Sequence, residues 1–329
     1  MFQAVTIKDP HFRFGFDKPI GRTDTFFKDI KTKLDFIIDY GSEQGIDTLI
    51  TTGDVFDIKA TSRYDLSKIN KNLSIMDSLT DQFFFWLSIS GNHDLPFSSI
   101  DNKAESFYFY AITNGIIEDI AFKSYTDRNV TVYGLDFTSD LFELKNYMAK
   151  INKDSKKLKD LDLTKTKRTI LVIHEHVIPD GYAFKFGHHL LYSEIASLIP
   201  DIDILVAGHL HKGFKTVKQN NTWIVNPWSF TRLARNYYSL NDEHIPQFSH
   251  IKITESGDIS IQDIDIPHKS YKEAFIEEDL DRILERDTSI TEFTSSLSSF
   301  YIDNNLTEIA SGKLKARIEH YLELAGNLN

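Results

Sequence analysis

The chain has 329 residues, which allows a large core and about two domains, and its 41% hydrophobic and 26% charged residues are those of an ordinary globular protein. It has no cysteine, which excludes disulfides and thiolate metal sites, so any bound metal must have nitrogen and oxygen ligands. The net charge of −11 argues against a protein that grips nucleic acid alone, because such proteins usually carry a large basic face.

The N-terminal residues lack the basic start and apolar stretch of a signal peptide. No segment approaches the roughly 20 apolar residues that a membrane span needs. We therefore expect a cytoplasmic protein with no membrane segment.

Short apolar runs alternate with amphipathic patterns through the first two-thirds of the chain. Thr23 or Asp24 is expected to cap a helix that Gly45 ends, and a second helix carries Leu66, Ile69, Leu73 and Met76. Strands are predicted at residues 2–7, 48–52, 84–88, 130–135, 169–173, 203–207 and 223–225. Strands interleaved with helices in this way predict an α/β fold with a layered core.

The later part of the chain has a different sequence pattern. Residues 150–168 are rich in Lys and favour a solvated surface connection over a phosphate contact. Residues 249–253 and 258–264 predict a hairpin, and the chain turns helical from residue 269. The last helix presents Leu314, Ile318, Tyr321, Leu322 and Ala325 on one face. We therefore divide the chain at residues 1–236, 237–268 and 269–329.

Five polar clusters stand where predicted strands end. They are Asp9-Pro10-His11, the run from Gly53 to Asp57, the run from Gly91 to Asp94, His174, and the run from Gly208 to His211. In layered α/β folds, ligand sites form outside the carboxyl ends of the strands, so we expect these clusters to converge.

The chemistry of these clusters favours metal binding. Carboxylate, imidazole and amide oxygen are ligands for Mn²⁺, Fe²⁺, Zn²⁺ or Ni²⁺. Two metals roughly 4 Å apart need a shared carboxylate, and Asp54 on a central loop is the natural bridge. The predicted metal-binding residues are Asp9, His11, Asp54, Asn92, His174, His209 and His211.

Other residues near these clusters have open roles. His93, beside Asn92, is placed to protonate a leaving oxygen, and Asp94 could orient its imidazole. Asp57 either caps the following segment or supports the site. His176 is an alternative to His174, and the pair His188 and His189 is expected in a surface loop.

In this order, D-x-H, G-D-x-x-D, G-N-H-D, a strand-end His and G-H-x-H resemble the calcineurin-like metallophosphoesterase superfamily. Residues 53–57 and 225–232 look most like the SbcD-type nuclease subunits, in the compact form found in bacteriophages. The resemblance covers about residues 1–236 and implies a layered αββα core with a smaller α+β or helical C-terminal region.

The resemblance also implies a function. It implies two divalent ions, usually manganese, with Asp9, His11 and His211 on one, Asn92, His174 and His209 on the other, and Asp54 between them. It implies 3′ to 5′ exonuclease action on duplex DNA and endonuclease action on single strands or hairpins, in DNA repair, recombination or replication. The implied partner is an SMC-like ABC ATPase of the SbcC type, bound through the C-terminal helices by a nuclease homodimer within a heterotetramer. A phage protein would act in the host cytoplasm.

Substrate contact is predicted for basic residues near the expected metal face. Asp57, Arg13, Lys59, Arg63 and Arg232 are the candidate substrate-binding residues, and Lys18, Arg22, Lys212, Lys215 and Arg235 could extend the patch. Two other functions are weighed against the nuclease: a phosphodiesterase for a small ester such as a cyclic nucleotide, which the charge of −11 would not trouble, and a non-enzymatic scaffold. The scaffold is disfavoured because every ligand position holds a competent ligand.

Overall fold

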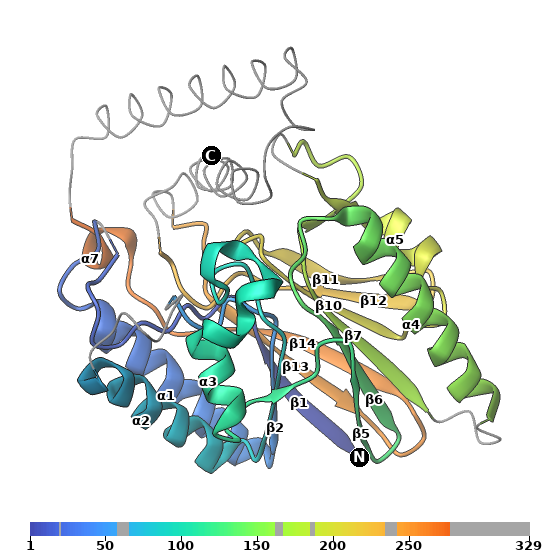
Figure 1. Ribbon diagram of the computed structural model, residues 1–329, viewed down its shortest axis with the longest axis horizontal. Coiled ribbons are helices and arrows are strands. Elements are labelled where there is room, and N and C mark those ends of the chain that lie inside the picture. Colours follow the sequence, from blue (N-terminus) through green and yellow to red (C-terminus); the bar gives the residue numbers. More distant parts are fainter. Residues whose placement is uncertain (20, 58–65, 162–166, 185–187, 234–241, 277–329) are drawn as a thin grey trace.

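Two six-stranded sheets form the centre of the molecule (Figure 1). The computed structural model describes residues 1–19, 21–57, 66–161, 167–184, 188–233 and 242–276. The first sheet, in spatial order, consists of β14 (Ile259–Asp265), β13 (Gln247–Ile253), β1 (Phe2–Ile7), β2 (Thr48–Thr51), β3 (Phe85–Ser88) and β4 (Glu118–Asp119). The second consists of β11 (Phe214–Gln219), β12 (Thr222–Asn226), β10 (Ile204–Gly208), β7 (Arg168–His174), β6 (Val130–Leu135) and β5 (Ser124–Asp127).

Helices cover the outer face of each sheet. Figure 1 shows α1 (Phe26–Gln44), α2 (Leu66–Gln82) and α3 (Phe107–Thr113) beside the first sheet, and α4 (Leu141–Leu161) and α5 (Tyr192–Leu198) beside the second. Short elements complete the described chain: β8 (Val177–Ile178), β9 (Leu190–Leu191), α7 (Tyr271–Ala274) and 3-10 turns at Pro96–Ser98 and Ile100–Glu105. The predicted α/β fold with layers in the order αββα is confirmed.

Alternating side chains on each strand build three apolar layers, because successive residues of a strand point to opposite faces. On β1, Ala4 packs between the two sheets, whereas Val5 and Ile7 pack against the helices of the first sheet. On β7, Val172 lies between the sheets and Ile173 faces the helices of the second. Strands buried on both faces explain why these runs are almost wholly apolar in sequence.

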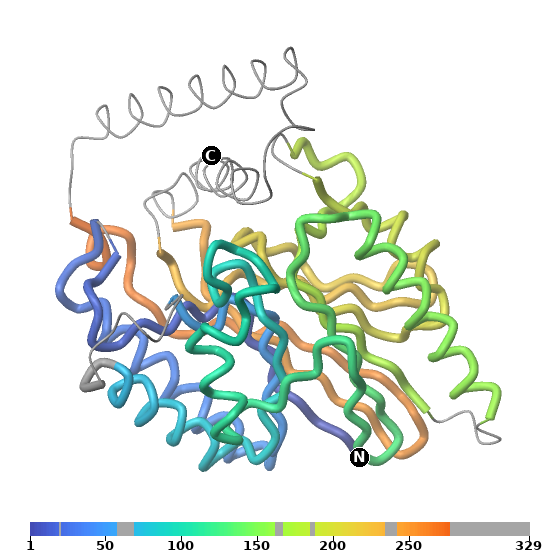
Figure 2. The backbone as a smooth tube through the Cα atoms, in the orientation of Figure 1, coloured from blue at the N-terminus to red at the C-terminus, as the bar shows by residue number. Residues whose placement is uncertain are grey.

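The parallel strands bring their carboxyl ends to a common region. β1, β2 and β3 run parallel in one sheet, and β6, β7, β10 and β12 run parallel in the other. The smooth trace in Figure 2 shows β1 running from the N-terminus at the lower edge of the view toward the middle of the molecule. The predicted hairpin forms as β13 and β14, and β13 pairs antiparallel with β1 along its whole length. The hairpin therefore completes the first sheet.

Two local predictions were wrong. Helix α1 begins at Phe26 after Thr25, because Thr23 instead bonds through its backbone N–H to Ala274 O, at 3.0 Å. The Lys-rich stretch predicted as a solvated surface connection at residues 150–168 is helical up to Leu161, because α4 continues through it. Ile151 and Ser155 are buried at helical spacing on the face of α4 that packs on the second sheet, and the Lys side chains occupy the solvent side.

Within the described residues, no helix is long and apolar enough to cross a lipid bilayer. The predicted C-terminal helices fall at residues 277–329, outside the described residues. The division of the chain into three parts stays a prediction.

Candidate metal centre

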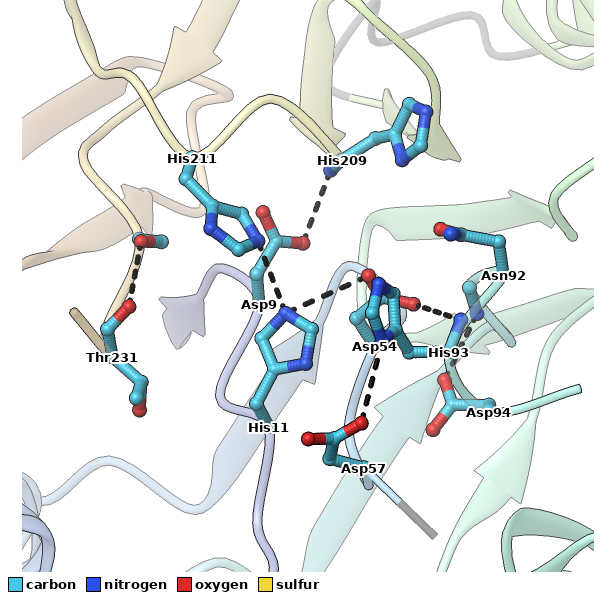
Figure 3. Close-up of polar contacts among 12 residues, drawn as sticks. Asp9, His11, Asp54, Asp57, Asn92, His93, Asp94, His209, His211 and Thr231 are labelled. Atoms are coloured by element: carbon cyan, nitrogen blue, oxygen red, sulfur yellow. Dashed lines mark hydrogen bonds and ion pairs between the residues drawn. The ribbon is translucent and has the colours of Figure 1, made fainter. Parts of the chain in front are cut away.

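All five predicted clusters lie at carboxyl ends of parallel strands. Asp9 and His11 follow β1, Asp54 follows β2, Asn92 and His93 follow β3. His174 is the last residue of β7, while His209 and His211 follow β10. Figure 3 shows residues from both sheets turned toward one another around Asp54.

The backbone of this region is strained. Four of the predicted metal-binding residues lie in the left-handed region, with φ of 45° at Asp9, 48° at His11, 48° at Asp54 and 81° at His209. Residues other than glycine rarely adopt this conformation, which costs about 1 kcal/mol or more and clusters at functional sites. This backbone conformation directs the four side chains toward the junction of the two sheets.

Close packing of the backbone also depends on glycine. A Cβ added to Gly91 would lie 2.2 Å from Asp54 Oδ1, and a Cβ added to Gly208 would lie 2.5 Å from Thr52 O. Neither position has room for a side chain, so these glycines let the loops carrying Asn92 and His209 approach Asp54.

A first group of possible ligands consists of His11, Asp54 and His211, whose candidate ligand atoms all lie within 4.8 Å of one another. The Nε2 atoms of His11 and His211 are 3.0 Å apart, and His11 Nε2 is 3.6 Å from Asp54 Oδ2 (Figure 3). Two imidazole nitrogens and a carboxylate oxygen at this spacing form part of a coordination sphere for a divalent transition metal.

A second group consists of Asp54, His174 and His209. His174 Nε2 lies 3.4 Å from Asp54 Oδ2 and 3.0 Å from Asn92 Oδ1. The other ring nitrogen, Nδ1, lies 2.7 Å from Thr52 O, a partner that fixes the ring and leaves Nε2 to the site. Because Asp54 belongs to both groups, the arrangement has the shared carboxylate that a two-metal centre requires.

The environment of the Asp9 carboxylate shows whether a cation fits at this place. Its carboxylate is fully buried; Oδ1 accepts the backbone N–H of His209 at 3.0 Å, whereas Oδ2 has no hydrogen-bond partner. A buried carboxylate oxygen without a partner is costly, and a bound cation would satisfy it. The residues present therefore fit a metal centre.

Three of the predicted histidine ligands have pKa values that suit metal binding, whereas the charge of Asp54 raises the pKa of the fourth, His174, to about 10 despite its burial. Burial lowers the pKa of His11 to about 4 and holds the pKa values of His209 and His211 well below the usual range. These imidazoles are therefore neutral near pH 7, which is the form that binds metals. At Asp54, burial acts to raise the pKa, but the neighbouring His174 and His93 hold it well below its usual value.

His93 lies beside this centre with two supporting residues. Its backbone N–H donates to Asp54 Oδ1 at 2.7 Å, and its Nδ1 lies 3.3 Å from Asp57 Oδ1. The second oxygen of Asp57 pairs with Arg13 Nη1. Burial acts to raise the pKa of Asp57, but the hydrogen bond and charge of His93, with the charge of Arg13, hold it below the usual range. Asp57 and Arg13, both predicted near the substrate, thus form one chain of contacts with His93.

The predicted orienting role of Asp94 was wrong. Its carboxylate is fully buried and accepts three backbone N–H groups, from Val55 at 3.1 Å, Phe56 at 2.8 Å and Gly91 at 2.9 Å. Because its oxygens are committed to the loops after β2 and β3, Asp94 fixes their separation, and the carboxylate at the His93 ring is that of Asp57.

The predicted substrate contact by Arg232 was also wrong. Arg232 is 2% exposed, and its guanidinium contacts Asp242 Oδ1, the carbonyl of Lys269 and the ring of Phe275. Its carbonyl accepts from Arg22, which is also buried. A cation enclosed in this way holds Asp242, Lys269 and Phe275 together and is not presented to a substrate.

Two other predicted basic residues contact neighbouring side chains, and three lie outside the described residues. Lys18 pairs with the exposed Asp24 at 2.7 Å, and the Lys212 ammonium lies over the ring of Tyr182 at 5.2 Å. Residues predicted for substrate contact that lie outside the described residues are Lys59, Arg63 and Arg235.

Two features beside the centre were not singled out from the sequence. Lys8 is buried, with Nζ on Asn226 Oδ1 and, at 3.2 Å, on Lys212 O, and burial lowers its pKa to about 8 despite the charge of Asp9. The buried Glu175 groups with His176 and His209 as a further set of possible ligands. Lys8 could have been identified from the sequence, because a Lys at the end of an apolar strand directly precedes Asp9.

His188 and His189, which were predicted in a surface loop, have specific contacts near the group of Glu175, His176 and His209. His188 Nε2 lies 3.6 Å from Glu175 Oε2, and the ring of His189 packs against Phe184 at 5.3 Å. The ring of His176 lies 4.0 Å from that of His209. The structure therefore places His176 next to the predicted ligands, with His174 in contact with Asp54 and Asn92.

Solved structures similar to this one have low sequence identity. The protein TT1561 of Thermus thermophilus has 12% identity and a TM-score of 0.46, covering 79% of this chain and 98% of its own. A putative 5′-nucleotidase from Staphylococcus aureus has 13% identity and a TM-score of 0.46, covering 85% of this chain and 56% of its own. A dimetal phosphatase from Danio rerio has 11% identity and a TM-score of 0.44, covering 82% and 99%.

No curated protein matches the sequence. A family profile described as calcineurin-like phosphoesterase matches residues 9–213, a span that begins at Asp9 and ends two residues after His211. The match covers more than half of the chain and contains every predicted metal-binding residue. The chain belongs to the calcineurin-like phosphoesterase family.

Proposed function

We propose that this protein is a two-metal nuclease that hydrolyses the phosphodiester backbone of DNA. The observation that carries the proposal is the pair of ligand groups that share Asp54, with His93 bonded to the same carboxylate through its backbone. Family membership supports metal-dependent hydrolysis of a phosphoester. The choice of DNA as substrate rests on further arguments given below.

Each metal would have its own set of ligands around Asp54. Asp9, His11 and His211 would hold one ion, and Asn92, His174 and His209 the other, with manganese as the favoured metal. When bound, the ions would supply Lewis-acid stabilisation of the phosphate charge and lower the pKa of bound water. Family membership and the ligand groups support a metal centre of this kind without fixing the metal.

His93 would protonate the leaving oxygen. Its Nδ1 faces Asp57, so the proton transfer falls to Nε2. The Asp57 carboxylate favours the charged imidazolium and fixes the ring orientation. Arg13 in turn holds Asp57 in place.

DNA is favoured as the substrate by the resemblance to the SbcD-type nucleases in residues 53–57 and 225–232. On this basis the activity would be 3′ to 5′ exonucleolytic on duplex DNA and endonucleolytic on single strands or hairpins. An SMC-like ATPase of the SbcC type would supply the basic surface that a chain of net charge −11 lacks. Partner binding would use residues 269–329, in a heterotetramer built on a nuclease dimer.

The acidic balance favours a second candidate, hydrolysis of a small phosphate ester such as a cyclic nucleotide. The two candidates would share the metal centre and differ in substrate. The test is to incubate the full chain, in Mn²⁺, with labelled linear duplex DNA, a DNA hairpin and a cyclic nucleotide, with and without an SbcC-type ATPase. Cleavage of DNA supports the nuclease, whereas hydrolysis of the cyclic nucleotide alone refutes it.

A further inference from the structure

The loop that follows Asn92 and His93 carries an exposed aromatic residue. Phe97 is 52% exposed, although Leu95 and Pro96 directly before it are buried. Figure 2 shows the segment between β3 and α3 at the end of the molecule away from the N-terminus, where the strands that carry the site end. A single exposed apolar residue is common on protein surfaces, but one in the loop that follows two predicted site residues is placed to contact a substrate.

The backbone at this position is strained. Phe97 has φ 57° and ψ 23°, and Ser98 has φ 51°. A bulky residue in the left-handed region is an outlier, and two such residues in succession are rarer still. Asn or Gly would adopt this conformation with less strain, so the conformation itself does not require a Phe.

The loop is nevertheless firmly held. Ser98 Oγ donates to Asn92 O at 3.3 Å, and Ser98 N–H donates to Leu95 O at 3.0 Å. Asn102 Nδ2 donates to Pro96 O at 3.3 Å. Ser98 therefore ties the segment to the backbone of a predicted metal-binding residue, and Phe97 is its immediate neighbour.

From these observations we infer that Phe97 is a nucleobase-stacking residue that binds a base of the substrate next to the phosphate being cleaved. The inference rests on the proposed nuclease function and names how the substrate is gripped. Base stacking on an aromatic side chain needs no positive charge and tolerates every base, so it suits an acidic protein. A ring held in advance on a fixed loop loses little conformational freedom when the base binds.

The chain offers a matched control. Phe84 is 79% exposed and precedes the first residue of β3, whereas Phe97 follows the carboxyl end of the same strand. The two rings are therefore alike in chemistry and lie beyond opposite ends of one strand. Only Phe97 is on the side of the proposed metal centre.

The experiment compares Phe97→Asn, Phe97→Trp and Phe84→Asn with the unmutated full chain. Single-stranded oligonucleotides carrying 2-aminopurine are bound in Ca²⁺, and gels verify that they stay intact. Cleavage in Mn²⁺ is then measured on normal and abasic oligonucleotides. We expect the unmutated protein, Phe97→Trp and Phe84→Asn to quench the 2-aminopurine fluorescence, and Phe97→Asn to lose the quench. KM for the normal oligonucleotide should rise about 5- to 150-fold in Phe97→Asn. KM for the abasic oligonucleotide should stay unchanged.

Thermal unfolding separates this role from a structural one. Phe97→Asn should unfold at the same or a higher temperature than the unmutated protein, because Asn tolerates the left-handed conformation. A clear fall in the unfolding temperature would overturn the inference, as would an undiminished quench or equal KM values in Phe97→Asn, the results expected if Phe97 contacts a protein partner. If the unmutated protein cleaves no DNA, the proposed function itself fails; if DNA is cleaved normally by Phe97→Asn, only the stacking role fails.

Discussion

Asp57→Asn is the substitution that most directly tests the proposed proton transfer. It keeps the size of the side chain and removes the negative charge that lies between His93 Nδ1, at 3.3 Å, and the guanidinium of Arg13. Asp57 forms a separate possible ligand group with His11 and His93 but belongs to neither group that contains Asp54, so we expect those two groups to keep their ions. The expected result is a lower kcat with both ions still bound.

The size of the effect follows from the geometry. Two unit charges 3.3 Å apart attract by about 5 kcal/mol at an effective dielectric constant of roughly 20. Asp57 and His93 are 18% and 17% exposed, so water remains near both and part of this attraction is offset by desolvation. A net contribution of about 1.5–3 kcal/mol is typical of a hydrogen bond to a charged group. This corresponds to a loss of roughly 10- to 150-fold in kcat.

Single-turnover cleavage of a labelled duplex in saturating Mn²⁺ measures this loss, with metal content determined on the same samples. Asp35→Asn is the matched control, since Asp35 pairs with Lys31 at 2.8 Å on the exposed face of α1. The control should cleave at the normal rate. A wild-type rate in Asp57→Asn, alongside a large loss in His93→Ala, would show that Asp57 does not support His93 and that the assigned chain of contacts is incorrect.

Further predictions concern the metal centre and its surroundings. His93→Ala should reduce kcat by about 10²- to 10⁴-fold with metal content nearly intact, whereas Asp54→Ala should lose metal as well, and elemental analysis distinguishes the two. Gly91→Ala should weaken metal binding by at least about 10-fold, as measured by Mn²⁺ titration, because the added Cβ would lie 2.2 Å from Asp54 Oδ1. Arg232→Met should lower the free energy of unfolding by about 1–3 kcal/mol and leave KM for DNA unchanged; a raised KM would restore its substrate role. Because the pKa of Asp57 is lowered in the folded protein, its contribution to stability should be complete above the ordinary Asp pKa of about 4. That contribution should be lost as the pH falls further, so denaturant titrations of the protein and of Asp57→Asn should converge at low pH.

The strand ends could be predicted from the sequence because two local signals coincide there. Apolar runs buried on both faces mark the strands, and a polar cluster marks each carboxyl end, with a glycine beside three of the five clusters, at Gly53, Gly91 and Gly208. Topology then brings the clusters together, because parallel strands end on the same side. The prediction that Asp54 is central needed no more than this, and the structure places it in both ligand groups.

Side-chain partners could not be predicted in the same way. Asp94 is adjacent to His93 in sequence, and Asp57 belongs to another of the predicted motifs. Only the loop geometry decides which of the two carboxylates contacts the imidazole. Arg232 looked like a substrate contact because its motif lies near the site, but its burial depends on Phe275 and Asp242, which are distant in sequence. Such roles depend on long-range packing that no local pattern contains.

The acidic composition constrains this site less than a count of charges implies. Screening confines the effect of distant surface charges to about 8 Å at physiological ionic strength. Within that range, the predicted ligands contribute two carboxylates, Asp9 and Asp54, and Asp57, Asp94 and Glu175 lie beside them. Two divalent ions would offset most of this charge. Arg13 and Lys8 add positive charge beside the same loops. A phosphate approaching the loaded centre would therefore meet a local field set by the ions and these few side chains more than by the net charge of −11, while the longer reach of a DNA duplex would still favour a basic partner.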